Sequence, residues 1–209
     1  MIGIIDYKAG NLASVRNALN RLDVSSFVSS DPDKLAGASG IIFPGVGHAE
    51  SAMNALKEVR MDSFLRQTDQ FVLGICLGMQ LLYTSTEESS SNCLGVIEGR
   101  LSKFDPGISK VPHMGWNTVD TIRDHPLVKD LGEQPWFYFV HGYYAPLTPE
   151  TLGKCHYQNS FTAITARDNF MGVQFHPEKS GRSGNKILTN YIEMVTSQNP
   201  EKYSLKQTE

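Results

Sequence analysis

The 209 residues of this chain are 40% hydrophobic and 20% charged, which suits one globular domain with a sizeable core rather than two. The formal charge of −3 has no long basic or acidic block behind it, so nothing indicates nucleic-acid binding or electrostatic attachment to a membrane. The first six residues turn acidic too early for a signal peptide, and no apolar run approaches membrane-spanning length, so we expect a cytoplasmic protein.

Strand and helix patterns alternate through the first third of the chain. In order, they predict a strand at 1–6, a helix at 11–22 capped by Asn11, a strand at 24–29, a short helix at 31–35, a strand at 40–43 that ends at Pro44, and a helix at 49–65. Strand–helix–strand units with short links imply parallel strands with crossover helices, hence an α/β fold. Ligand chemistry in such a sheet gathers at the carboxyl ends of strands, where the loop 44–47 lies.

The next predicted strand, 71–75, runs directly into Cys76, and a helical apolar pattern begins after it. Gly74 and Gly78 flank the cysteine, as a sharp strand-to-helix turn requires where two backbones approach closely. At a helix N-terminus the macrodipole favours negative charge on the sulfur, which makes Cys76 a candidate nucleophile. On this local pattern alone, a small buried structural cysteine is an equal alternative.

The second half of the chain is predicted mostly as strands. The expected elements are a serine-rich loop at 84–93, a strand at 94–97, a hairpin at 99–107, a short strand at 113–117, a central strand at 136–144, strands at 162–167 and 172–175, a helix at 186–195 and a polar tail at 199–209 that frays. Cys93 and Cys155 form no CxxC pair with Cys76 and leave an odd cysteine over. We therefore expect no metal site and no disulfide framework.

Pro177 ends the strand at 172–175, so His176 projects from a strand terminus. Glu178 is two residues further on, and residues two apart in an extended segment point the same way, so its carboxylate can orient the imidazole. Cys76, His176 and Glu178 thereby fit the roles of nucleophile, general base and orienter of the base. Taken alone, a histidine near an acidic residue is more often a surface hydrogen bond.

An acyl-transfer intermediate needs two backbone N–H donors aimed at its oxyanion. The N–H of Leu77 follows the nucleophile directly, and Gly45 and Gly47 allow the peptide that carries the Val46 N–H to rotate into place as the second donor. We expect this loop to be catalytically incomplete until a partner or substrate stabilises the rotated state. Without the cysteine, such a loop is usually just a turn.

The glycine-flanked Cys76 followed by Gln80, the His-Pro-Glu-Lys-Ser segment 176–180 and the Pro-Gly-Val-Gly loop 44–47 resemble the class I glutamine amidotransferases. Further motifs bring the sequence closest to the glutaminase subunits of imidazole glycerol phosphate synthases, from histidine biosynthesis: Asp-Tyr at 6–7, Gly-Asn-Leu at 10–12, Pro-His-Met-Gly-Trp-Asn at 112–117 and Val-His-Gly-Tyr-Tyr at 140–144. The resemblance implies a single domain at 1–198 with a central, mostly parallel mixed sheet flanked by helices and the cysteine on a nucleophile elbow.

The same resemblance implies hydrolysis of glutamine to glutamate and ammonia through a Cys76 thioester, with no cofactor. The ammonia passes to a cyclase subunit, a TIM barrel, which makes imidazole glycerol phosphate and the ribotide AICAR. Substrate contacts are expected at Gln80, His141, Gly142 and Tyr143, with Gly142 standing where relatives often carry Ser or Thr.

Contacts with the cyclase are implied at Asn11, His113, Trp116 and Lys179. From the residues alone, these positions read instead as a helix cap, a short packed strand for His113 and Trp116, and a solubilising surface lysine.

Three alternatives stay open. A glutaminase that serves another synthase, such as pyridoxal phosphate or anthranilate synthase, shares the triad but differs at the 44–47 loop. A cysteine hydrolase or peptidase acting alone needs an open groove for an extended peptide. A non-catalytic binding module on the same fold would have no use for the three triad residues together.

Overall fold

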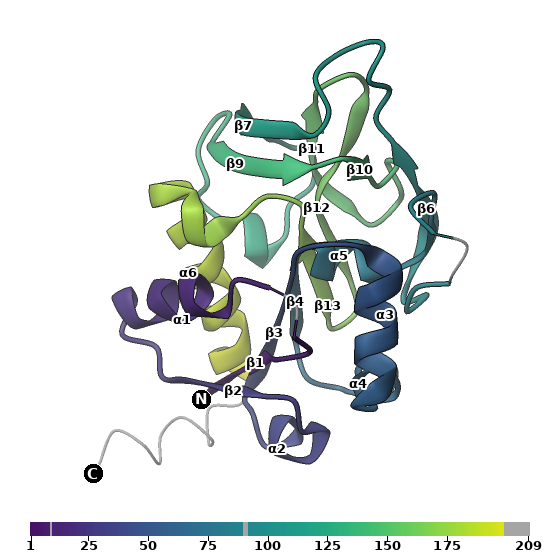
Figure 1. The fold of residues 1–209 in the computed structure, drawn as a ribbon. Helices are drawn as coiled ribbons and strands as arrows, with labels where there is room; N and C mark the ends of the chain where they lie inside the picture. The colour runs from purple at the N-terminus through teal and green to yellow at the C-terminus, as the bar shows by residue number, and fades with distance from the viewer. Residues whose placement is uncertain (9, 90–91, 199–209) are drawn as a thin grey trace.

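The computed structural model describes residues 1–8, 10–89 and 92–198, so the tail expected at 199–209 lies outside the described residues (Figure 1). The helices are α1 (Leu12–Arg21), α2 (Pro32–Ala36), α3 (Ala49–Glu58), α4 (Met61–Gln67), α5 (Leu77–Leu82), α6 (Gly181–Gln198) and the 3-10 turns η1 (Pro126–Val128) and η2 (Pro177–Lys179). The strands are β1 (Ile2–Ile5), β2 (Ser26–Ser29), β3 (Gly40–Gly45), β4 (Val72–Cys76), β5 (Tyr83–Thr86), β6 (Ile97–Lys103), β7 (His113–Thr118), β8 (Asp120–Thr121), β9 (Trp136–His141), β10 (Tyr143–Tyr144), β11 (Thr151–His156), β12 (Ser160–Arg167) and β13 (Phe170–Val173).

A sheet of eight strands forms the centre of the molecule, in the order β2-β1-β3-β4-β13-β12-β11-β8. The strands from β2 to β13 run parallel, whereas β12, β11 and β8 add an antiparallel edge. This confirms the predicted α/β class and the mixed, mostly parallel sheet. The register of β3 and β4 sets Gly45 opposite Cys76, so the loop after β3 lies beside the cysteine.

Helices cover both faces of this sheet: α1 and α6 lie on one face, and α3, α4 and α5 on the other (Figure 1). Each face has its own apolar cluster because successive side chains of a strand point to opposite sides. Along β3, Ile42 joins the cluster under α1 and α6, while Ile41 and Phe43 join the cluster under α3 to α5.

Two smaller sheets complete the fold. Strands β10, β6 and β5 form one of them, and β7 pairs with β9 in an antiparallel ribbon that sets His113 opposite His141. The prediction of a central strand at 136–144 was therefore wrong, because β9 pairs with β7 and β10 with β6, and neither enters the main sheet. The hairpin predicted at 99–107 was also wrong: β6 is one strand, parallel to β5 and antiparallel to β10.

Some predicted boundaries moved for physical reasons. Strand β3 continues through Pro44 to Gly45. Proline is tolerated there because β1 pairs with β3 only as far as Ile42, so that at Pro44, which has no N–H to donate, β4 is the one neighbouring strand. The single helix predicted at 49–65 is divided at Arg60, whose φ of 58° is left-handed. The polar segment at 84–93 contains part of β5, and the strand expected at 94–97 begins only at Ile97.

Candidate active site

The turn from β4 into α5 has the predicted elbow geometry. Cys76 has φ 53° and ψ −108°, a conformation that side-chain-bearing residues rarely adopt. The glycines around it are required by space: a Cβ on Gly78 would overlap the carbonyl oxygen of Phe43, and a Cβ on Gly74 would lie 2.8 Å from the carbonyl carbon of Gly78. This close approach of α5 to β3 holds the buried thiol at the carboxyl end of the sheet.

His176 lies just beyond β13 and Glu178 lies in the 3-10 turn that follows. The imidazole Nδ1 donates to Glu178 Oε1 at 2.8 Å, and both side chains are buried. The carboxylate reaches the ring through the turn, not along the extended segment that we predicted. Because Nδ1 is bonded to the carboxylate, Nε2 is the ring nitrogen that remains for Cys76.

Opposing effects act on His176. Burial lowers the pKa of the imidazole, but hydrogen bonds to Cys76 and Glu178 and the negative charges of these two groups outweigh burial and raise the pKa from 6.5 to about 10. The ring therefore holds its second proton at neutral pH, beside the sulfur of Cys76. An imidazolium next to a sulfur nucleophile is equipped to protonate a leaving group.

A buried pair of side-chain amides supports the cysteine. Gln80 Nε2 donates to Tyr143 O at 2.9 Å and to Gln174 Oε1 at 3.1 Å, which uses both of its hydrogens. Gln174 must then turn its own Nε2 toward Cys76 Sγ, 3.8 Å away, while the thiol lies 3.6 Å from the carbonyl oxygen of Val140. Gln174 was not predicted as a site residue; the available signal was a polar side chain in an otherwise apolar, buried segment after β13, where it needs a partner.

The hydrogen bonds of two buried histidines fix their tautomers. His141 Nδ1 must donate to the carbonyl of Tyr143 at 2.8 Å, so its Nε2 accepts from His113 Nδ1 at 3.0 Å, and His113 Nε2 accepts from Asn117 Nδ2 at 3.3 Å. Burial lowers the pKa of His113 to about 4 and that of His141 to about 3. Both rings are neutral at physiological pH.

A cavity of about 230 Å³ opens over the thiol. Its lining gathers the triad's Cys76 and His176, the loop residues Val46 and Gly47, Leu77 at the start of α5, the expected substrate contacts Gln80, His141, Gly142 and Tyr143, and in addition Glu88, Val140 and Lys179. Glu88 belongs to the segment 84–93 that was predicted as a serine-rich loop, and no role was predicted for it. In the structure its Oε2 accepts from the Ala49 N–H at 2.6 Å, and the acidic side chain borders the cavity.

The model of the class-I glutamine amidotransferase family matches residues 4–194 of this chain. The chain belongs to this family. Among its relatives, the imidazole glycerol phosphate synthase subunit HisH of Bacteroides fragilis is 45% identical over 195 residues, which cover 92% of this chain and 99% of the relative. The subunit of the same name from Maridesulfovibrio salexigens is 43% identical over 204 residues, 92% and 96% of the two chains.

Solved structures agree on the amidotransferase fold at much lower sequence identity. A glutamine amidotransferase superposes with a TM-score of 0.73 at 15% identity, covering 93% of this chain and 98% of that one. PurLQS from Thermotoga maritima gives a TM-score of 0.70 at 18% identity with the same coverage. The fold of this chain is thus shared by proteins of very different sequence.

The residues expected at a partner interface occupy different environments in this amidotransferase. Trp116 is 52% exposed on the β7–β9 ribbon, and Lys179 is exposed with its Nζ 5.9 Å from the Tyr138 ring. Asn11 is exposed but also caps α1, accepting from the Ser14 N–H at 3.2 Å. His113 is only 3% exposed and stacks between other rings, which does not fit the partner-facing position that the resemblance implied.

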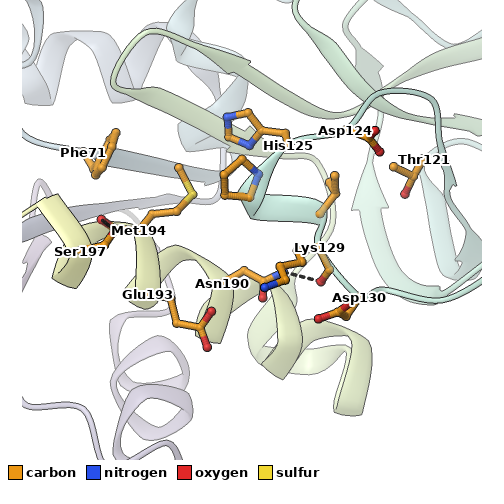
Figure 2. A pocket seen from close by; sticks show the side chains of 12 residues that line it. Phe71, Thr121, Asp124, His125, Lys129, Asp130, Asn190, Glu193, Met194 and Ser197 are labelled. Carbon is orange, nitrogen blue, oxygen red and sulfur yellow. Dashed lines mark hydrogen bonds between the residues drawn. The ribbon is translucent and has the colours of Figure 1, made fainter.

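A larger groove of about 900 Å³ lies between η1 and α6 (Figure 2). His125 and Lys129 border it from the η1 side and Asn190 and Met194 from α6, with the Asn190 amide donating to the Lys129 carbonyl at 2.8 Å. None of its lining residues also lines the cavity over Cys76. The groove is therefore a separate feature from the amidotransferase site.

The remaining cysteines have the properties of structural residues. Cys93 and Cys155 are free and buried, and burial raises the pKa of the Cys93 thiol to about 11 and that of Cys155 to about 12. Over residues 1–8, 10–89 and 92–198, no cluster of three His, Cys, Asp or Glu side chains is arranged to hold a metal ion. Across the same part of the chain, no helix combines the length and apolar character needed to span a membrane.

Proposed function

We propose that this chain is the glutaminase subunit of an imidazole glycerol phosphate synthase, formed by residues 1–198 as one unit. It hydrolyses glutamine to glutamate and ammonia, and the ammonia passes to a cyclase subunit with a TIM-barrel fold that makes imidazole glycerol phosphate and AICAR. The observation that carries the chemistry is the meeting of Cys76 and His176 at one cavity, with Glu178 hydrogen-bonded to His176 behind it. The assignment to this synthase is supported by relatives of that name that align over nearly their whole length.

The reaction begins with the proton of the Cys76 thiol on His176, so that Sγ attacks the side-chain amide carbon of glutamine as a thiolate and forms a tetrahedral intermediate. His176 Nε2 gives its proton to the amide nitrogen, so the C–N bond breaks, ammonia leaves and a thioester remains. The neutral imidazole then removes a proton from water, whose oxygen attacks the thioester and releases glutamate and the thiolate. Glu178 holds the ring by Nδ1 throughout both steps.

The oxyanion of both tetrahedral states is held by the N–H groups of Leu77 and Val46. Leu77 is at the start of α5, where its N–H has no partner within the helix. Val46 borders the cavity between Gly45 and Gly47, and Gly47 has the left-handed φ of 103°. These glycines give the loop the freedom that positioning the Val46 N–H requires.

The polar groups around the thiol recognise the substrate. The Glu88 carboxylate supplies the negative charge that the α-ammonium group of glutamine requires, and Gln80 offers Oε1 because both of its amide hydrogens are engaged in the protein. His141 fixes the Tyr143 carbonyl through Nδ1. Gly142 leaves space at the cavity, since a Cβ there would meet only Val111 Cγ1 at 3.6 Å.

The partner-facing surface we propose is the exposed side of the β7–β9 ribbon together with Lys179 and Asn11. Met114, Trp116 and Trp136 are each more than half exposed on this ribbon, an apolar area larger than isolated surface residues provide. We also propose a cytoplasmic location. It is supported by three free cysteines, one of which must stay reduced to react.

The first experiment measures glutamate release from glutamine by the chain alone, and then with the cyclase subunit and its nucleotide ligand. We expect strong activation in the complex, loss of activity in Cys76→Ala, and retention of activity in the matched control Cys93→Ala, which replaces another buried cysteine. Full activity of the chain alone would keep the glutaminase chemistry but reject gating by the partner, and no activity in either state would favour another synthase partner or a non-catalytic scaffold. Activation by a different synthase partner, but not by this cyclase, would reassign the subunit.

A further inference from the structure

Tyr7 follows β1 and is 1% exposed, yet its hydroxyl has no hydrogen-bond partner within the described part of the chain. Its ring packs against Phe43, with the ring centroids 5.6 Å apart. Phenylalanine would fill the same space without burying an unpaired polar group, which is destabilising. A buried tyrosine hydroxyl of this kind calls for a functional explanation.

The position of this hydroxyl suggests the explanation. It lies directly against Gly45, because a Cβ on that glycine would overlap the Tyr7 oxygen. Gly45 is paired with Cys76 in the sheet register, and its carbonyl belongs to the same peptide group as the Val46 N–H. The hydroxyl therefore lies next to the one peptide that the proposed mechanism must orient.

The two ends of a peptide group point in opposite directions. When the Val46 N–H is aimed into the cavity, the Gly45 carbonyl must point away from the cavity and into the protein. Gly45 is buried, so its carbonyl then needs a donor from the protein. The unpaired Tyr7 hydroxyl is a donor in contact with this residue.

We propose that Tyr7 is a positioning residue of the oxyanion loop, whose hydroxyl donates to the Gly45 carbonyl when the Val46 N–H faces the cavity. This inference rests on the proposed function. In the present structure the hydroxyl is unpaired, so this bond is not yet made and the donor is available for it. Burial, and then the charge of Cys76, hold the pKa of Tyr7 well above its ordinary value of 10.0, so the hydroxyl keeps its proton at every working pH.

The test is Tyr7→Phe in the complex with the cyclase subunit. We expect kcat for glutamate release to fall by about 10- to 100-fold, which is no more than the fall in kcat caused by removing an oxyanion donor itself. KM for glutamine should stay within about twofold of the parent value. The loss should be the same at pH 6.5 and pH 8.5. The midpoint of thermal unfolding should stay the same or rise, because an unpaired buried hydroxyl is removed.

The matched control is Tyr83→Phe, another fully buried tyrosine whose hydroxyl is also unpaired within the described residues but which does not line the cavity. Its kcat should equal that of the parent. An unchanged kcat in Tyr7→Phe, or a change confined to KM, overturns the inference. A loss of kcat that comes with a lower unfolding midpoint assigns the effect to packing and also overturns it.

Glutamate release by the parent complex distinguishes a failure of the proposed role of Tyr7 from a failure of the proposed function. If it releases glutamate and Tyr7→Phe does so equally well, the role of Tyr7 fails while the glutaminase function stands. If the parent complex releases none, the proposed function fails and the role of Tyr7 falls with it.

Discussion

The lack of space for a side chain at Gly78 leads to a quantitative prediction about the elbow. An alanine Cβ at this position would overlap the carbonyl oxygen of Phe43 and lie 2.9 Å from its carbonyl carbon and 3.4 Å from Cγ of its ring. The obstacle is the backbone of β3, which pairs with β4 at Phe43, so it cannot rotate away as a flexible side chain does. Helix α5 would have to move off the sheet, carrying Leu77 with it.

Inserting a methyl group into a well-packed site commonly costs 1–3 kcal/mol, and a contact with immobile backbone belongs at the upper end or beyond. We therefore expect Gly78→Ala to lower the free energy of unfolding by about 3 kcal/mol. For a domain of this size, that corresponds to a decrease of about 6–12 °C in Tm. Glutaminase activity should fall as well, because the displaced helix carries one of the two proposed oxyanion donors.

The matched control is Gly37→Ala. Gly37 has φ −82°, and a Cβ there would meet only Lys34 O at an ordinary 3.5 Å, so we expect no loss, or a gain of up to about 1 kcal/mol. Both variants are compared with the parent by urea unfolding and by thermal unfolding followed by circular dichroism. If Tm of Gly78→Ala lies within about 2 °C of the Gly37→Ala value, the reasoning that space forces glycine at the elbow is wrong.

Three further predictions concern polar groups. Because the pKa values of His113 and His141 are lowered to about 4 and about 3, the unfolded chain takes up protons that the native chain does not, so stability is present above pH 6.5 and is lost as the pH falls below it. Between pH 6 and 5, His113→Gln should therefore make the pH slope of the unfolding free energy shallower by about 1 kcal/mol per pH unit; an unchanged slope contradicts this. Glu88→Gln keeps an acceptor for the Ala49 N–H but removes the charge, so we expect KM for glutamine to rise at least tenfold in steady-state assays, with kcat changed far less. Gln174→Met removes the N–H beside Cys76 Sγ, and we expect kcat to fall about tenfold at constant KM; an equal kcat would show that this contact does not act on the nucleophile.

Features with a local cause were predicted well from the sequence. The elbow could be predicted from Gly74 and Gly78, because the close packing of α5 against the sheet leaves no space for a side chain at these two positions beside Cys76. The starts of α1 and α2 follow from Asn11 and Asp31, whose side chains accept from backbone N–H groups at the helix ends. Alternating strands and helices were sufficient for the α/β class.

Features set by distant parts of the chain were missed. The break between α3 and α4 is made by Arg60 in a left-handed conformation, for which neither glycine nor proline gives a signal. The aromatic residues of β9 have the composition of a central strand, but their partner is β7, and that choice depends on the whole topology. The resemblance placed His113 at a partner interface, whereas the side chain is buried and stacks on Phe139 and Tyr157, residues 26 and 44 positions later.

The β7–β9 ribbon joins the exposed apolar surface to the reacting groups. A two-stranded ribbon has little stability of its own and depends on what it packs against. Here β9 is held by the His176 N–H, which donates to Tyr138 O at 2.9 Å, and by Ser180 Oγ, which accepts from Tyr138 N at 3.0 Å, while the carbonyl of Val140 faces Cys76 Sγ. Trp116 packs edge-on against Tyr138 from the exposed side. A partner that binds on this face therefore acts on the strand that positions both the thiol and the imidazole, without having to contact either of them.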